Sequence, residues 1–148
     1  MKKIIVILLM IGIFLLLLIY SDFRNANAKL GENITVSKEM DDFILHIRIE
    51  NTQEGIEVFR SLQYIGNEEV VVHHQSPLIS VSMDHKNHDF TGSPVNRTLK
   101  SGNVYIPQDP DIFPIPRSEK MTNIYFEARF KVNGEWKVID HVEELHFN

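Results

Sequence analysis

Five residues in the middle of the chain have side chains that could bind a metal ion. Imidazole and carboxylate suit zinc and other divalent transition metals, and the chain has no cysteine to supply a thiolate. His73 and His74 are adjacent on an expected strand, so they point to opposite faces and at most one of them could join the site. The spacing matches no established ligand motif. The candidate ligands are His73, Asp84, His85, His88 and Asp89.

A proline-rich stretch is the candidate interaction surface. Pro107–Pro116 contains four prolines in ten residues, which excludes a helix and a central strand and predicts an extended surface crossing. A preformed extended segment loses little entropy on binding. The apolar residues Ile112, Phe113 and Ile115 either anchor a protein partner or pin the crossing to the core.

Residues for catalysis are present without a catalytic signature. Several serines could act as nucleophiles, but no nucleophile elbow surrounds them, and Gly92-Ser93-Pro94 is typical of a turn. Adjacent carboxylates such as Asp41-Asp42 point apart on a strand and indicate solvated turns or edges. We expect a protein that is not an enzyme and has no cofactor.

The first 28 residues have the pattern of an export signal. Lys2 and Lys3 precede the apolar run Ile4–Tyr20, and Ala26-Asn27-Ala28 offers small residues where a signal peptidase cleaves. As a helix, 17 residues span roughly 25 Å, slightly less than a hydrocarbon core of about 30 Å. The segment is therefore either a cleaved signal peptide or a retained membrane anchor. In both cases residues 29–148, expected to be one domain, would lie outside the cytoplasm.

Composition narrows the class of partner. Lys2, Lys3, Arg24 and Asp22 contribute +2 to the whole-chain charge of −5, which leaves −7 for residues 29–148. An acidic domain without a basic run is a poor nucleic-acid binder. Export without cysteine excludes a disulfide framework and a lipoprotein anchor, and together with the lysine-led signal it favours a Gram-positive bacterium.

Alternation of apolar and polar residues predicts seven to nine short strands and no helix in residues 29–148. Their number and spacing are typical of an all-β, antiparallel immunoglobulin-like sandwich behind the N-terminal helix. The clearest strands are Phe43–Glu50, Ile56–Ile65 and Ile124–Val132. Weaker ones are Ile34–Ser37, Val70–His73, Leu78–Met83, Asn96–Lys100, Val104–Ile106 and Glu144–Phe147.

The last clear strand continues into a hairpin around Asn133-Gly134. A two-residue turn would leave Trp136 and Val138 on the polar face, whereas a three-residue turn over Val132–Gly134 would set Phe130 opposite Trp136. We expect the three-residue turn because it buries the only tryptophan.

Four short motifs recur at strand ends and turns: Leu62–Asn67, Val70–His74, Pro77–Ile79 and Leu99–Tyr105. Together they resemble small exported immunoglobulin-like proteins of bacilli, a group that has no assigned activity. More distantly, Ile49-Glu50-Asn51-Thr52 is similar to the immunoglobulin-like domain of the bacillar intracellular proteinase inhibitor. The resemblance covers about Leu45 to Val132 and implies a β-sandwich, with no functional residue carried over.

The sequence therefore favours a non-enzymatic binding module outside the cytoplasm, released or anchored, whose partner is a protein or a cell-envelope component. One alternative is a protease inhibitor acting through an exposed loop, either His85–Pro94 or Pro107–Pro116. The other is a divalent-metal protein that uses the His/Asp group.

Overall fold

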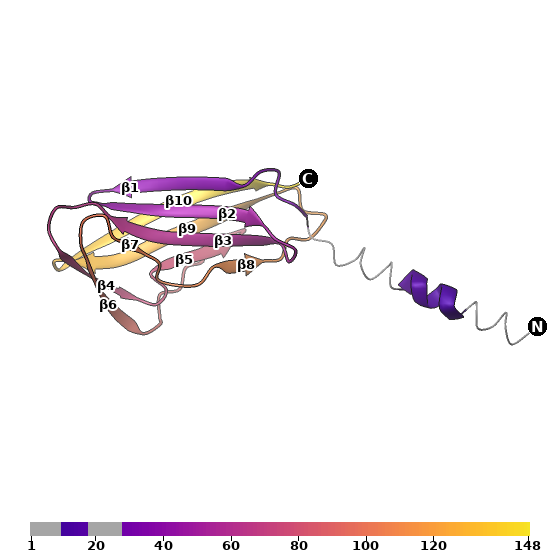
Figure 1. The fold of residues 1–148 in the computed structure, drawn as a ribbon, viewed down its shortest axis with the longest axis horizontal. Coiled ribbons are helices and arrows are strands. Elements are labelled where there is room, and N and C mark those ends of the chain that lie inside the picture. The colour runs from indigo at the N-terminus through magenta and orange to yellow at the C-terminus, as the bar shows by residue number, and fades with distance from the viewer. Residues whose placement is uncertain (1–9, 18–27) are drawn as a thin grey trace, which may run out of the picture.

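The computed structural model describes residues 10–17 and 28–148, and residues 10–17 form a helix (Figure 1). None of the helices in these ranges combines the length and apolar character needed to cross a membrane. Most of the predicted signal or anchor segment, including Ala26 and Asn27, lies outside the described residues. Ala28 is buried, and its N–H donates to Ile115 O at 3.0 Å, so the folded domain includes one residue before the predicted boundary.

Residues 28–148 fold as two antiparallel sheets packed face to face, which confirms the predicted two-layer all-β architecture (Figure 1). Sheet I contains β1 (Ile34–Met40), β2 (Phe43–Asn51), β3 (Ile56–Tyr64), β7 (Val104–Tyr105) and β8 (Asp111–Phe113). Sheet II contains β4 (Val70–Gln75), β5 (Ile79–Met83), β6 (Pro94–Leu99), β9 (Met121–Val132) and β10 (Glu135–His146).

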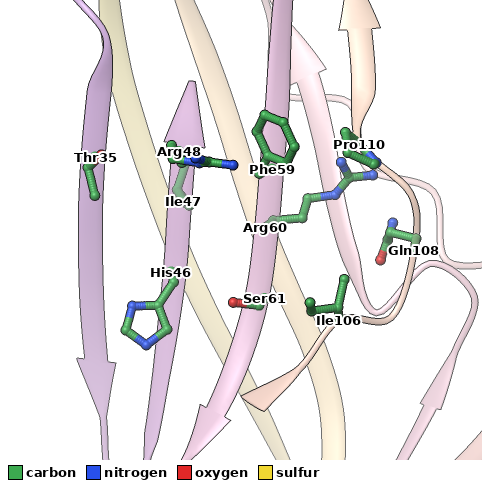
Figure 2. A pocket seen from close by; sticks show the side chains of 10 residues that line it. All are labelled: Thr35, His46, Ile47, Arg48, Phe59, Arg60, Ser61, Ile106, Gln108 and Pro110. Atoms are coloured by element: carbon green, nitrogen blue, oxygen red, sulfur yellow. The ribbon is translucent and has the colours of Figure 1, made fainter. Parts of the chain in front are cut away.

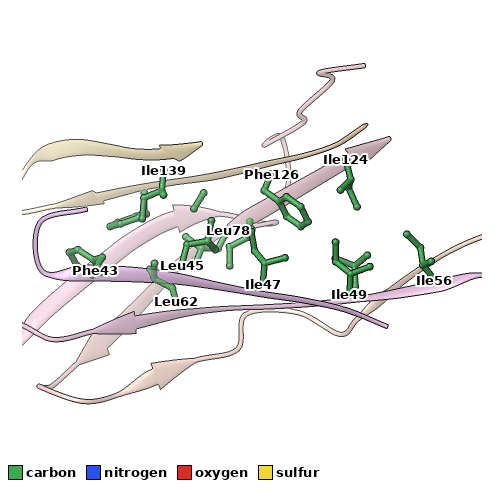
Figure 3. Packing of buried hydrophobic residues seen from close by; sticks show 14 of the residues in the cluster. Phe43, Leu45, Ile47, Ile49, Ile56, Leu62, Leu78, Ile124, Phe126 and Ile139 are labelled. Carbon is green, nitrogen blue, oxygen red and sulfur yellow. The ribbon is translucent and has the colours of Figure 1, made fainter. Parts of the chain in front are cut away.

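The core lies between the sheets and follows the predicted alternation. Every second residue of β2 and β3 is buried, and most of β9 repeats this pattern, because one face of each strand must leave water (Figure 3). Fully buried examples are Leu45, Ile47, Ile49, Ile56, Leu62, Ile124, Phe126 and Phe130. The buried hydrophobic residues of the described chain all belong to residues 28–148, so this fragment holds the complete described core.

The turn between β9 and β10 differs from the expectation. Val132 pairs with Glu135, and Asn133 and Gly134 both have positive φ, which is the signature of a two-residue type I′ turn. Trp136 therefore pairs with Lys131 and is 62% exposed. The expected three-residue turn is wrong because the Asn-Gly pair satisfies the twist of the hairpin directly, and this preference outweighs burial of one indole.

Strand β10 is longer than expected and lies at an edge of sheet II, where its ladder partner is β9. The separately predicted strand Glu144–Phe147 is largely the end of β10. Lys137, His141 and Glu143 share the inward side of β10 with its buried apolar residues. There the Lys137 ammonium pairs with the Asp41 carboxylate at 2.7 Å. Inward-facing charges at a sheet edge oppose pairing with another chain.

Two interruptions on one flank of the sandwich create two adjacent recesses. In sheet I, β7 pairs with Leu62 and Gln63 and β8 pairs with Ile56–Val58, so residues 59–61 of β3 have no strand partner on that side. Residues 106–110, here called the crossing segment, bridge this gap. In sheet II, β4 and β5 both lie along β9, but β6 pairs with β4 alone.

Candidate functional site

The gap in sheet I opens into a groove of about 330 Å³, here called the sheet I groove. Phe59 and Ser61 line it from β3, and Ile106 and Pro110 line it from the crossing segment (Figure 2). Ile106 is 70% exposed, the highest value among the large apolar residues of the described sandwich. The groove therefore combines an apolar wall with the part of β3 that has no strand partner on that side.

Side chains of β2 give this groove a fixed basic floor. The Arg48 guanidinium lies 4.2 Å from the centre of the Phe59 ring and pairs with Glu50 at 3.1 Å. His46 accepts a hydrogen bond from the Ser37 hydroxyl at Nδ1 and donates from Nε2 to Gln63 Oε1, each at 2.8 Å. His46, Arg48 and Arg60 line the groove, and no Asp or Glu is among its lining residues.

Ser37, His46 and Gln63 have the order of a nucleophile, a base and an orienting group. Gln63 is an uncharged amide, so it orients the imidazole but cannot stabilise an imidazolium as the carboxylate of a hydrolase triad does. These hydrogen bonds have a structural role, because they connect side chains on the neighbouring strands β1, β2 and β3.

Arg60 is a buried charge that sequence reasoning missed. It occupies an inward position of β3, and its side chain is 3% exposed. It donates to Ile79 O at 3.1 Å, to Val58 O at 3.2 Å and to the Asp111 carboxylate at 2.5 Å. Burial lowers the pKa of Arg60, and Asp111 opposes that shift. Arg60 thus links β3 of sheet I to β5 through Ile79 and to β8 through Asp111.

The structure does not bring the five predicted metal ligands together. Within residues 10–17 and 28–148, no group of three or more His, Asp or Glu side chains is arranged to hold a metal ion. His73 is exposed on β4 and donates to Asn96 Oδ1 at 2.6 Å, whereas His74 is buried on the opposite face, as expected. Strand β4 thus directs His73 toward Asn96 on β6, away from the predicted ligand loop that follows β5.

The other four candidates lie in residues 84–93, here called the covering loop, between β5 and β6. Asp84 accepts a hydrogen bond from the Thr122 hydroxyl, and Asp89 accepts one from the Thr91 N–H at 2.9 Å. His85 is exposed, and its backbone N–H donates to Met83 O at 2.7 Å. Two of these side chains therefore have local partners that a metal would have to displace.

His88 is half-buried, and both of its ring nitrogens are shielded from water without a hydrogen-bond partner among the described residues. Burial lowers its pKa from 6.5; Glu127 and Asp140 oppose the shift, while Lys86 and Arg129 add to it. Lys86 connects the covering loop to the carboxylates of sheet II. Its ammonium pairs with Asp140 on β10 at 3.2 Å and with Glu127 on β9 at 3.4 Å.

Acidification should destabilise the fold through His88. The unfolded chain binds the His88 proton near pH 6.5 and the folded chain only at lower pH, so stability falls as pH drops below about 6.5 until the folded pKa is passed. Urea unfolding followed by circular dichroism at pH 7.5 and 5.5 measures this loss. His88→Phe should lose less stability than the original chain, and an equal loss in both would contradict the prediction.

The predicted partner-binding residues divide between core and surface. Ile115 is 2% exposed and belongs to the core, so of its two alternatives it takes the one that pins the crossing, and Phe113 is half-buried and packs against the same core. Ile112 remains exposed on β8. The sequence signal that could have identified the groove is Phe59, an aromatic residue in the outward phase of β3, together with Ile106 beside the first proline of the crossing.

Comparison with known proteins finds a distant structural similarity and no match in sequence. No protein-family model matches the chain, and no curated protein matches it significantly. Among solved structures, the chain is similar to the crystal structure of the GAE domain of GGA2p from Saccharomyces cerevisiae. The sequence identity is 11% and the TM-score 0.43, over 77% of this chain and 97% of that chain. Functional proposals for this protein therefore rest on its own geometry.

Proposed function

We propose that this protein is a non-catalytic, immunoglobulin-like binding module that holds a segment of a protein partner in the sheet I groove. The immunoglobulin-like assignment is supported by two antiparallel sheets built from short strands, with the core between them. The proposal rests on one observation: the exposed Ile106 side chain lies beside residues 59–61 of β3, which have no strand partner on that side.

The groove favours an extended segment with one apolar side chain and acidic neighbours. Ile106, Pro110 and Phe59 form an apolar wall that such a side chain would cover. Arg48 and His46 are held by their own contacts, so little side-chain freedom is lost on binding. Arg48 presents an exposed positive charge to the groove and no lining residue is acidic, so acidic flanks suit the groove better than basic ones.

A displayed random-peptide library selected on the fragment 28–148 tests this proposal. We expect enriched peptides with an apolar residue next to Asp or Glu. Their affinity should fall at least tenfold in Ile106→Ser, as loss of a hot spot of about 2 kcal/mol or more implies.

The matched control is Val142→Ser, which removes an exposed apolar residue from β10 in the other sheet. It should leave the affinity unchanged. Equal losses in both variants, or peptides that bind Ile106→Ser as well as the original fragment, would remove the groove from the proposal.

The proposed location is outside the cytoplasm, supported by Lys2, Lys3 and the apolar run that follows them. When the full chain carrying a C-terminal tag is expressed in a Gram-positive host, the tag should be cut by protease added to intact cells or appear in the medium. N-terminal sequencing then separates release from anchoring. A tag protected until the cells are lysed would contradict export.

A further inference from the structure

Strand β5 has one edge paired with β9 and one free edge, and the hydrogen bonds show which residues face each. Leu78 O accepts from Arg129 N at 3.0 Å, and Asp84 N donates to Asn123 O at 2.9 Å, so the even-numbered residues direct their backbone groups toward β9. Ile79, Val81 and Met83 consequently direct theirs to the other side.

Two of these three outward positions are already filled. Gln108 pairs with Ile79 as a neighbouring strand would, with Nε2 donating to Ile79 O at 3.0 Å and Oε1 accepting from Ile79 N at 3.4 Å. At the other end, Met83 O accepts from His85 N. Between them, no described loop or crossing residue accepts a hydrogen bond from the Val81 N–H or donates one to its C=O.

Val81 faces a hollow of about 500 Å³, here called the β5 hollow, which is separated from the sheet I groove by the crossing segment. Its walls are mostly polar. Asn87 and Thr91 come from the covering loop, Gln108 and Asp111 from the other side, and Ser80 from β5 itself. Arg60 contributes to this hollow as well as to the groove.

We propose that the β5 hollow is a second binding site, which takes an extended peptide main chain that adds to the free edge of β5 at Val81. The Gln108 amide shows that this edge accepts an amide in strand-like geometry one pair of residues away. An incoming residue would accept from Val81 N–H and donate to Val81 C=O, while its side chains meet the hydroxyl and amide groups of the walls. A strand edge left without a partner favours this kind of occupant.

The probe is the blocked pentapeptide acetyl-Thr-Val-Thr-Val-Thr-amide, added at millimolar concentration to the isotope-labelled fragment 28–148. On binding, the Val81 amide proton should shift downfield and exchange with deuterium at least tenfold more slowly. The amides of Ser80 and Ser82, already directed toward β9, should change little. This alternation distinguishes main-chain pairing from contact with the walls.

Two variants complete the test. Val81→Pro removes the open N–H and should abolish binding, and because β9 does not use that N–H the strand can still pair. Ile106→Ser should leave the Val81 response intact, so loss of the groove and loss of the hollow remain distinguishable. The proposal is overturned if the Val81 amide is already protected without peptide, if the peptide shifts Asn87 and Thr91 but not Val81, or if no residue responds.

Discussion

Replacing Asp111 by alanine should lower the free energy of unfolding by about 3 kcal/mol, near the lower end of what breaking a buried ion pair costs. The substitution leaves the Arg60 guanidinium buried with two carbonyl partners and no counter-charge. We choose the lower end because the Asp111 side chain is 46% exposed and water already shares its charge. Urea unfolding of the fragment 28–148, followed by circular dichroism, measures the change.

Arg60→Met is the matched control. It removes the buried charge itself, keeps an apolar stem of similar length, and leaves Asp111 free to be hydrated, so it should cost less than Asp111→Ala. The opposite order would show that the carbonyl contacts of Arg60, rather than its ion pair with Asp111, hold the flank together. Because Asp111 lines the hollow and its partner Arg60 lines both recesses, Asp111→Ala should also weaken peptide binding at the groove and at the hollow.

Gly55→Ala should be the second most damaging of these substitutions, with a loss of at least about 2 kcal/mol. Gly55 has φ of 136°, which side chains rarely adopt, and an added Cβ would overlap the carbonyl oxygen of Phe113. That oxygen belongs to the end of β8, so the clash must displace either the β2–β3 turn or β8. The same unfolding measurement on Gly55→Ala reports the cost.

Gly102→Ala separates the two causes. Gly102 also has positive φ, at 82°, but a Cβ there would meet nothing within 4 Å. This variant should lose about 1 kcal/mol from backbone strain alone. If the two variants lose the same stability, the overlap with Phe113 contributes nothing and the structure of this turn is wrong.

The regular part of the fold was predictable because period-two alternation is a local property. Strands β2, β3 and β9 each carry enough apolar residues on one face to identify the strand and its buried side. The turn chemistry is local too: Asn133-Gly134 favours a type I′ turn, and this preference, rather than burial of Trp136, sets the register of the hairpin.

The candidate site was not predictable to the same degree, since it depends on contacts between distant segments. Arg60 lies on the otherwise apolar, buried face of β3. A charge is tolerated there because Asp111, which is distant in sequence, pairs with it. The groove exists because β7 and β8 pair with different parts of β3. The histidines were conspicuous in sequence, but His73 is hydrogen-bonded to Asn96 on β6, and His88 turns its ring nitrogens away from water without a partner.

The exposed indole at position 136 also decides how this protein can be observed by fluorescence. As the only tryptophan, it already meets water in the native state, so its emission should start near the wavelength of free indole and shift little on denaturation. A flat fluorescence trace would not mean that the chain stays folded. The same residue makes a sensitive probe of encounters at the outer face of sheet II, where any molecule that covers Lys131 and Trp136 would change the emission at once.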